Sequence, residues 1–193
     1  MPSKAFLRIC DQLGRLERHT DPSVRRDVWE ALRHELGRRD LPADEEMLVL
    51  DSLITDALLY ADPALGRERE AWSLRAVQLG PRVSTLIGSR GAALVEAGRY
   101  EEGKAMLEPL VFAKDTVAFD GLISRIFLAR AEHALGDEAA ALPLMAQARE
   151  MTPTVGGGIV SALIERIENE MQPVAYGALL THHNAHSFSR IAP

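Results

Sequence analysis

Three histidines near the end of the chain, His182, His183 and His186, have the side chains and a spacing that could bind a metal ion. His182 and His186 would share one face if the segment were helical, because residues four apart are neighbours on a helix. The surrounding sequence shows no helical period and supplies no nearby cysteine or carboxylate as a further ligand. We therefore predict no metal site and no cofactor.

Two further arrangements could take part in anion binding or catalysis. The run Gly156-Gly157-Gly158 precedes a helical segment, where backbone N–H groups can hold an anion. It lacks the preceding strand and the lysine of phosphate-binding loops, so we interpret it as a break between helices. Glu101 and Glu102 form a carboxylate pair, but they fall at a turn that should face solvent. Since no nucleotide-binding, serine-hydrolase or zinc-protease motif occurs in the sequence, we predict a protein without catalytic residues.

Composition and charge restrict the class of protein. The 193 residues are 47% hydrophobic and 26% charged, as in ordinary soluble domains, and they are enough to bury one core. The net charge of −6 argues against nucleic-acid binding, which depends on neutralising phosphates. No apolar run approaches the roughly 20 residues that span a bilayer, so we expect no membrane insertion.

The cysteine content and the N-terminus bear on location. Cys10 is the only cysteine, so no disulfide can form within the chain. It lies among Phe6, Ile9 and Leu13, and we expect it to be a small buried core residue. The first residues lack the apolar segment of a signal peptide. The sequence therefore predicts a cytoplasmic protein.

The elements that would position any site are helices, because the chain is rich in alanine, leucine, glutamate and arginine. Residues 1–40 should form a helical hairpin, with apolar residues at helical spacing over 3–18 and a second helix from Pro22 to Gly37. Pro42 should start a third helix with a broad apolar surface, and a fourth covers about 66–79. The predicted fold class is all-α.

The stretch from Gly91 to Pro153 contains one pattern twice: a helix, a tight turn at Gly98 or Gly136, and a second helix. Small residues recur at a spacing of twelve, as Gly91 with Gly103 and Ala129 with Ala141. This spacing would place two small residues where the helices of one hairpin cross, which allows close approach. The core around these crossings should be filled by Leu94, Leu107, Leu128 and Met145.

This pattern resembles the tetratricopeptide repeat (TPR) family, whose helix–turn–helix unit has about 34 residues. Ala76 with Pro81, and Ala148 with Pro153, match an alanine and a proline that end such a unit. The resemblance implies a right-handed α-α superhelix over residues 41–153, with units at about 50–82, 84–115 and 122–153. A capping helix within 154–172 and an apolar tail over 173–193, which contains the three histidines, would follow. Departures from the family pattern occur at Arg90, Glu132 and Glu138.

In the TPR family the first helix of each unit faces the concave side, where partners bind. The resemblance therefore implies a groove formed by Ser89, Ala92, Glu96, Ile126, Phe127, Arg130 and His133. Phe127 would be an apolar anchor and Arg130 a fork for a carboxylate of the partner. The family's clamp for a C-terminal carboxylate is absent, because Gly88, Ala92, Ile123 and Phe127 stand at its positions. We expect an adaptor or assembly factor that binds a protein or peptide partner.

Three alternatives stay open. Ile126 and Phe127 would pack against the N-terminal hairpin or the tail if the groove were filled from within. The chain would be a self-associating structural protein, and hence a homo-oligomer, if its tail occupied its own or a neighbour's groove. A small ligand or a metal bound in the groove would make the protein regulatory or enzymatic.

Overall fold

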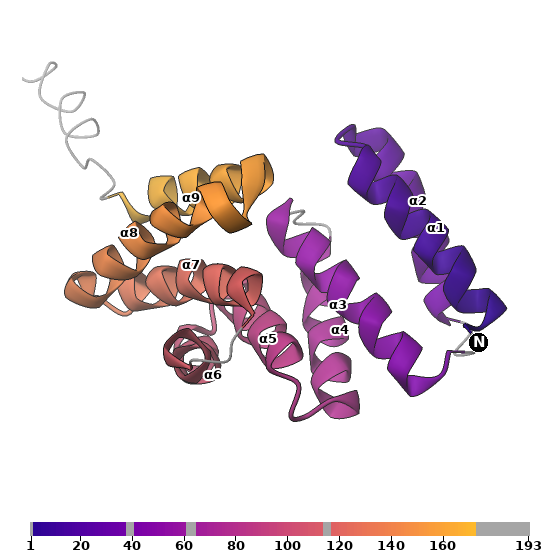
Figure 1. Ribbon diagram of the computed structural model, residues 1–193, viewed down its shortest axis with the longest axis horizontal. Helices are drawn as coiled ribbons and strands as arrows, with labels where there is room; N and C mark the ends of the chain where they lie inside the picture. Colours follow the sequence, from indigo (N-terminus) through magenta and orange to yellow (C-terminus); the bar gives the residue numbers. More distant parts are fainter. Residues whose placement is uncertain (1, 38–40, 61–64, 114–116, 173–193) are drawn as a thin grey trace, which may run out of the picture.

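A computed structural model describes residues 2–37, 41–60, 65–113 and 117–172. These residues form only α-helices and turns, which confirms the all-α prediction (Figure 1). The helices are α1 (Lys4–Arg18), α2 (Pro22–Gly37), α3 (Ala43–Leu59), α4 (Gly66–Leu79), α5 (Ser84–Glu96), α6 (Tyr100–Phe112), α7 (Ala118–Ala134), α8 (Glu138–Val155) and α9 (Gly157–Met171).

The helices pack in two layers. From α3 onward each helix contacts the next one along the chain, and α1 contacts α2. In addition α1, α3, α5, α7 and α9 contact one another in that order, so they form a continuous inner layer. The last helix also reaches α3, and Figure 1 shows α9 and the α1–α2 hairpin on either side of one end of α3. The inner layer therefore closes back on itself, because α3 contacts α9 in addition to its neighbours α1 and α5.

The N-terminal hairpin and α3 together enclose a hydrophobic core that is separate from the main core. Ser3 caps α1 by accepting a hydrogen bond from the Phe6 N–H. The indole rings of Trp29 and Trp72 stack at 5.4 Å between centroids, which connects this core to α4. The buried residues of the core are Ile9, Leu16, Val28, Trp29, Leu32, Val49, Leu53, Ala57 and Leu65.

The prediction that Cys10 is buried was wrong. Cys10 is exposed, although burial against its surroundings and the charge of Glu45 still raise the pKa of its thiol. The buried face of α1 is formed by Ile9 and Leu16, and the position after Ile9 is turned about 100° away from it on a helix. The apolar neighbours of Cys10 in sequence therefore do not enclose it.

The tight turns predicted at Gly98 and Gly136 are confirmed. Both residues have left-handed backbones, with φ of +78° and +89°, and they end α5 and α7 as a glycine after a helix commonly does. The predicted core residues Leu94, Leu107, Leu128 and Met145 are all buried. Local sequence chemistry was therefore sufficient to locate the two repeated hairpins.

The predicted close crossing of α5 and α6 is also present. A Cβ atom added to Gly103 would lie 2.9 Å from the Gly91 carbonyl oxygen and 2.5 Å from a methyl carbon of Val95. Because one of these neighbours is backbone, a rotamer change cannot relieve the contact. The two helices are thus held at a distance that only glycine permits.

We expect Gly103→Ala to lower the free energy of unfolding by about 1–2 kcal/mol, because overpacking outweighs the roughly 1 kcal/mol gained in helix propensity. Urea denaturation followed by circular dichroism measures the change. The control is Gly158→Ala in α9, where an added Cβ meets no atom within 4 Å. Equal behaviour of the two variants would contradict a close crossing.

The end of α8 differs from the prediction. The helix continues past Pro153 to Val155, and the break falls at Gly156 and Gly157, where Gly157 has φ of +62°. A proline near a helix end removes only one hydrogen bond, so it does not have to terminate the last turn. The final helix α9 consequently begins at Gly157, within the range 154–172 predicted for the capping helix.

Two of the departures from the family pattern are buried polar residues. Arg90 donates from Nη1 to the Glu70 carbonyl and to the Ser73 hydroxyl, both at 3.0 Å. Glu132 accepts a hydrogen bond from Lys104 Nζ at 2.7 Å. In both cases an interaction between neighbouring helices replaces the apolar contact that the family pattern would supply.

Candidate functional site

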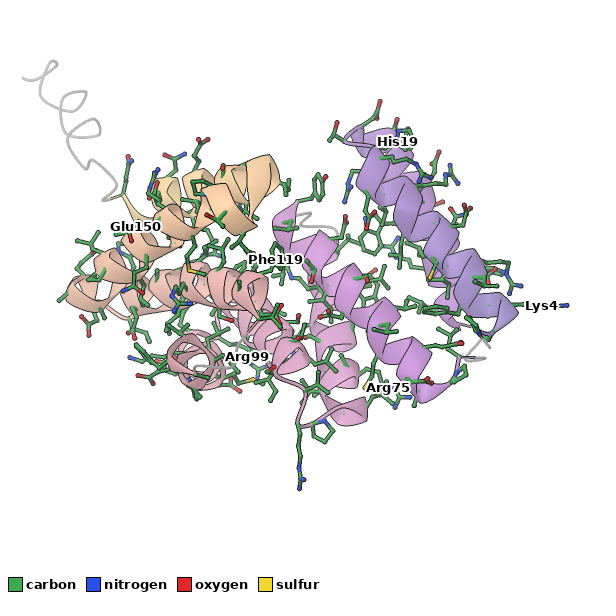
Figure 2. All side chains as sticks on the ribbon, in the orientation of Figure 1. Lys4, His19, Arg75, Arg99, Phe119 and Glu150 are labelled. Atoms are coloured by element: carbon green, nitrogen blue, oxygen red, sulfur yellow. The ribbon has the colours of Figure 1, made fainter. Side chains whose placement is uncertain are left out.

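A cleft of about 410 Å³ lies between α1, α3, α7 and α9. Phe119, labelled in Figure 2, lies at the start of α7 and forms part of the wall of the cleft. The cleft is lined by Leu13, Leu16, Glu17, Asp51, Ser52, Thr55, Asp56, Leu59, Tyr60, Phe119, Asp120 and Ile159. A narrower hollow shares Thr55, Leu59, Phe119 and Asp120 with it and continues inward to Ser89. The cleft is thus built from helices that are distant in sequence.

One wall of the cleft is held by Arg25 of α2. Its guanidinium donates from Nη1 to the carbonyl oxygens of Leu16 and His19, at 3.0 and 3.2 Å, and forms an ion pair with Asp56. The same group lies 3.5 Å from the ring centroid of Tyr60, in cation–π contact. Arg25 therefore joins the α1–α2 hairpin to α3 and neutralises Asp56.

The floor of the cleft carries two further carboxylates, Asp51 and Asp120. Asp51 accepts a hydrogen bond from the Ser89 hydroxyl at 2.8 Å, and Asp120 accepts one from the Thr85 hydroxyl at 2.6 Å. Burial, together with the negative charge of Asp120, raises the pKa of Asp51. Neither carboxylate forms an ion pair within the described ranges. The floor is therefore acidic and would be stabilised by an incoming cation.

Apolar side chains stand beside this acidic floor. Leu59 and Phe119 are half-buried, and Ile159 of α9 is 37% exposed. Among the described residues that line the cleft, none is lysine, arginine or histidine. The cleft therefore offers an apolar surface next to negative charge, which suits a segment that carries both apolar and basic side chains.

Three of the seven predicted groove residues have no exposed surface. Ala92, Ile126 and Phe127 are each 0% exposed and belong to the main hydrophobic core, which corrects the expectation that they line an open groove. The reason is that α5 and α7, which carry these side chains, pack against each other, and that α5 also packs against α3 and α7 against α9. The open alternative was that Ile126 and Phe127 pack against the N-terminal hairpin or the tail. Within the described ranges, the helices that pack against α7 include α9 and neither helix of the hairpin, and the tail lies outside these ranges.

The other four predicted residues lie in separate places. Ser89 is at the floor of the cleft, where its hydroxyl donates to Asp51. His133 Nδ1 lies 2.5 Å from Glu138 Oε1, at the turn between α7 and α8. Glu96 and Arg130 do meet, at 3.0 Å, but in a mostly buried cluster of ion pairs with Arg166 and Glu170. Arg130 therefore already forms ion pairs with two carboxylates of the same chain, although its Nη1 atom has no hydrogen bond.

Asp51, Asp120 and Phe119 were missed as site residues. A signal existed for Asp51, because it stands with Ser52 between the apolar residues Leu48-Val49-Leu50 and Leu53-Ile54, on a helix with a broad apolar surface. A carboxylate in such a position needs a partner or a solvent-filled cleft. Nothing in the sequence shows that α7 brings Asp120 to the same place.

No family model matches the chain, and no curated protein or solved structure resembles it closely enough to count as a match. Over the ranges that the structure describes, every helix is too short or too polar to cross a bilayer. In the same ranges no three histidine, cysteine or acidic side chains are grouped so that they could hold a metal ion. The three C-terminal histidines and the apolar tail lie outside the described residues.

Proposed function

We propose that the chain is a non-catalytic TPR-like interaction module, an adaptor or assembly factor of the cytoplasm. The layered packing supports this proposal, because α1, α3, α5, α7 and α9 follow one another on one side, as the first helices of stacked helical hairpins do. The glycine crossing of α5 with α6 and the left-handed turns at Gly98 and Gly136 also match the expected unit. A right-handed superhelix is part of the proposal.

The observation that carries the proposed binding site is the charge of the cleft. Within the part of the chain that the structure describes, four carboxylates line it without a basic residue: Glu17, Asp51, Asp56 and Asp120. Of these, Asp56 alone has a cationic partner there, Arg25. We infer that the cleft binds an extended or helical segment of a partner protein that presents lysine or arginine beside an apolar side chain. Electrostatic attraction would orient the segment, and Leu59, Phe119 and Ile159 would bury its apolar part.

Selection of peptides from a random display library by the immobilised protein tests this site. We expect enriched peptides to combine lysine or arginine with leucine or phenylalanine, and to bind at least about tenfold more weakly to Asp120→Asn. Asp44→Asn is the matched control, since it removes the same charge from an exposed position in the first turn of α3. The affinity for these peptides should fall as the pH decreases, and the fall should begin at a higher pH than the one at which an ordinary aspartate is protonated. The reason is that the pKa of Asp51 is raised and that protonation removes its charge. Enrichment of acidic peptides, or equal losses in both variants, would contradict the proposal.

A second candidate function is self-association through the tail. Residues 173–193 contain Arg190 and three histidines but no aspartate or glutamate, so their charge complements the acidic cleft. A protein truncated after Gln172 would then bind the selected peptides more tightly than the full chain does. Sedimentation of both proteins over a range of concentrations separates the cases: a neighbour's tail makes only the full chain associate, whereas the chain's own tail leaves both monomeric.

A further inference from the structure

A second hollow, of about 560 Å³, shares no lining residue with the cleft. Side chains from four helices point toward it: Arg67 and Arg69 from α4, Glu96 from α5, Arg130 from α7, and Arg166 with Glu170 from α9. These residues are far apart in sequence, so the fold brings them together. The hollow is a different surface from the proposed peptide site, and its function can be tested independently.

Glu96 is the centre of this arrangement. Its side chain is 8% exposed, and its carboxylate lies 2.6 Å from Arg166 Nη2, 3.0 Å from Arg130 Nη1 and 4.0 Å from Arg69 Nη2. Burial opposes ionisation of Glu96, but Arg130 and Arg166 outweigh it and lower the pKa of the carboxyl group. Glu96 is therefore charged at neutral pH and holds three guanidinium groups around the hollow.

The hollow keeps more positive than negative charge. Glu170 forms ion pairs with Arg130 and Arg166, at 2.8 and 3.0 Å, and is the second carboxylate that these arginines share. The remaining acidic lining residue, Glu70, is bound by Arg99 at 2.6 Å, outside the hollow. Four arginines thus line the space against Glu96 and Glu170, so an excess of positive charge remains.

Two donor atoms in the hollow also lack a hydrogen bond. The Nε atom of Arg166 and the Nη1 atom of Arg130 are buried and have no hydrogen-bond partner, although the latter is close to Glu96. Buried donors without a partner are costly, and an oxyanion in the hollow would supply one. Arg67 is exposed and offers a further guanidinium at the same hollow.

From this geometry we propose that the hollow binds the phosphate group of a small molecule. A phosphate dianion matches the excess of positive charge better than a monocarboxylate does, and its oxygens fit the forked donors of arginine. The volume exceeds that of one phosphate, so the rest of a small phosphorylated ligand fits beside it. Glu96 orients the arginines and does not itself contact the ligand.

Isothermal titration with inorganic phosphate and with pyrophosphate, at constant ionic strength, tests the proposal. We expect saturable binding of at least one of them, weakened about tenfold in Arg67→Gln, because one charge-assisted contact is lost. Arg82→Gln is the matched control, since it removes the same charge from an exposed position that does not line the hollow, and it should leave binding unchanged. Arg166→Gln should abolish binding in a protein whose circular dichroism shows that it is folded.

Three results would contradict the proposed phosphate site. If neither anion binds the full-length protein at millimolar concentration, the arginine cluster serves only to join the helices. Equal weakening in the Arg67 and Arg82 variants would show a general charge effect without a site. Succinate provides a third arm: binding of this dicarboxylate as tight as that of phosphate would overturn the assignment to phosphate. Since Arg67 is exposed, its variant keeps the test valid even if Arg166→Gln does not fold.

Discussion

Replacing Glu96 with glutamine is expected to lower the free energy of unfolding by about 3 kcal/mol. The amide cannot balance the guanidinium groups of Arg130 and Arg166, and a buried ion pair that loses one partner leaves an uncompensated charge. The value lies at the low end for such changes because these two arginine side chains, 17% and 26% exposed, keep some contact with water. Chemical denaturation at neutral pH measures the difference.

Glu102→Gln is the control for this prediction. Glu102 also pairs with an arginine, Arg99, but its side chain is 59% exposed, so its loss should have a much smaller effect. Comparable losses of stability in the two variants would show that burial of the carboxylate does not matter.

The same residue makes stability depend on pH. The pKa of Glu96 is lower in the folded protein than its ordinary value of 4.5, so its stabilising contribution is complete above pH 4.5 and is lost as the pH falls through the folded pKa. Stability of the wild-type protein should therefore decrease more steeply below pH 4.5 than that of Glu96→Gln. Parallel curves for the two proteins would exclude a depressed pKa.

Replacing Phe127 with alanine is expected to lower the free energy of unfolding by about 3–5 kcal/mol. Phe127 is 0% exposed and lies in the main core, so its loss removes apolar contacts and leaves a cavity. Thermal and urea denaturation measure the effect. If the urea midpoint shifts while the slope of the unfolding free energy against urea concentration stays the same, the variant has lost stability and not compactness.

Phe112→Ala is the matched control, because it removes the same side chain at the end of α6, where 72% of the residue is exposed. It should leave stability nearly unchanged. If Phe112→Ala were as destabilising as Phe127→Ala, the burial described for Phe127 would be wrong. The comparison also shows that a Phe127 variant would report on folding and could not test a binding surface.

Much of the fold could be predicted because it depends on local chemistry. The predicted helix over 66–79 coincides with α4, which begins at Gly66 and is followed by Gly80. Gly98 and Gly136 were recognisable because a tight turn after a helix favours a left-handed residue. The pair of Gly91 and Gly103 was recognisable because its spacing fits the crossing of two hairpin helices.

The site was harder to predict because it depends on contacts between distant residues. Arg166 and Glu96 are 70 positions apart, and no periodic pattern relates them. The resemblance placed Phe127 on an exposed face because it describes each unit alone, whereas α7 also packs against α5 and α9 and Phe127 is 0% exposed. Cys10 shows the converse error, since it directly follows the buried Ile9 but is turned about 100° from it around the helix and is exposed.

The contact between α3 and α9 limits how long this array of helices can be. In an open stack each unit touches only its neighbours, so units can be added or lost at an end and the ends can fray separately. Here the last helix touches α3, and its Arg166 pairs with Glu96 of α5, so the far end is joined back to the earlier helices. An extra hairpin inserted between α7 and α9 would break both connections. The number of hairpins is therefore set by closure, and fraying of α9 would weaken the middle of the molecule together with its end.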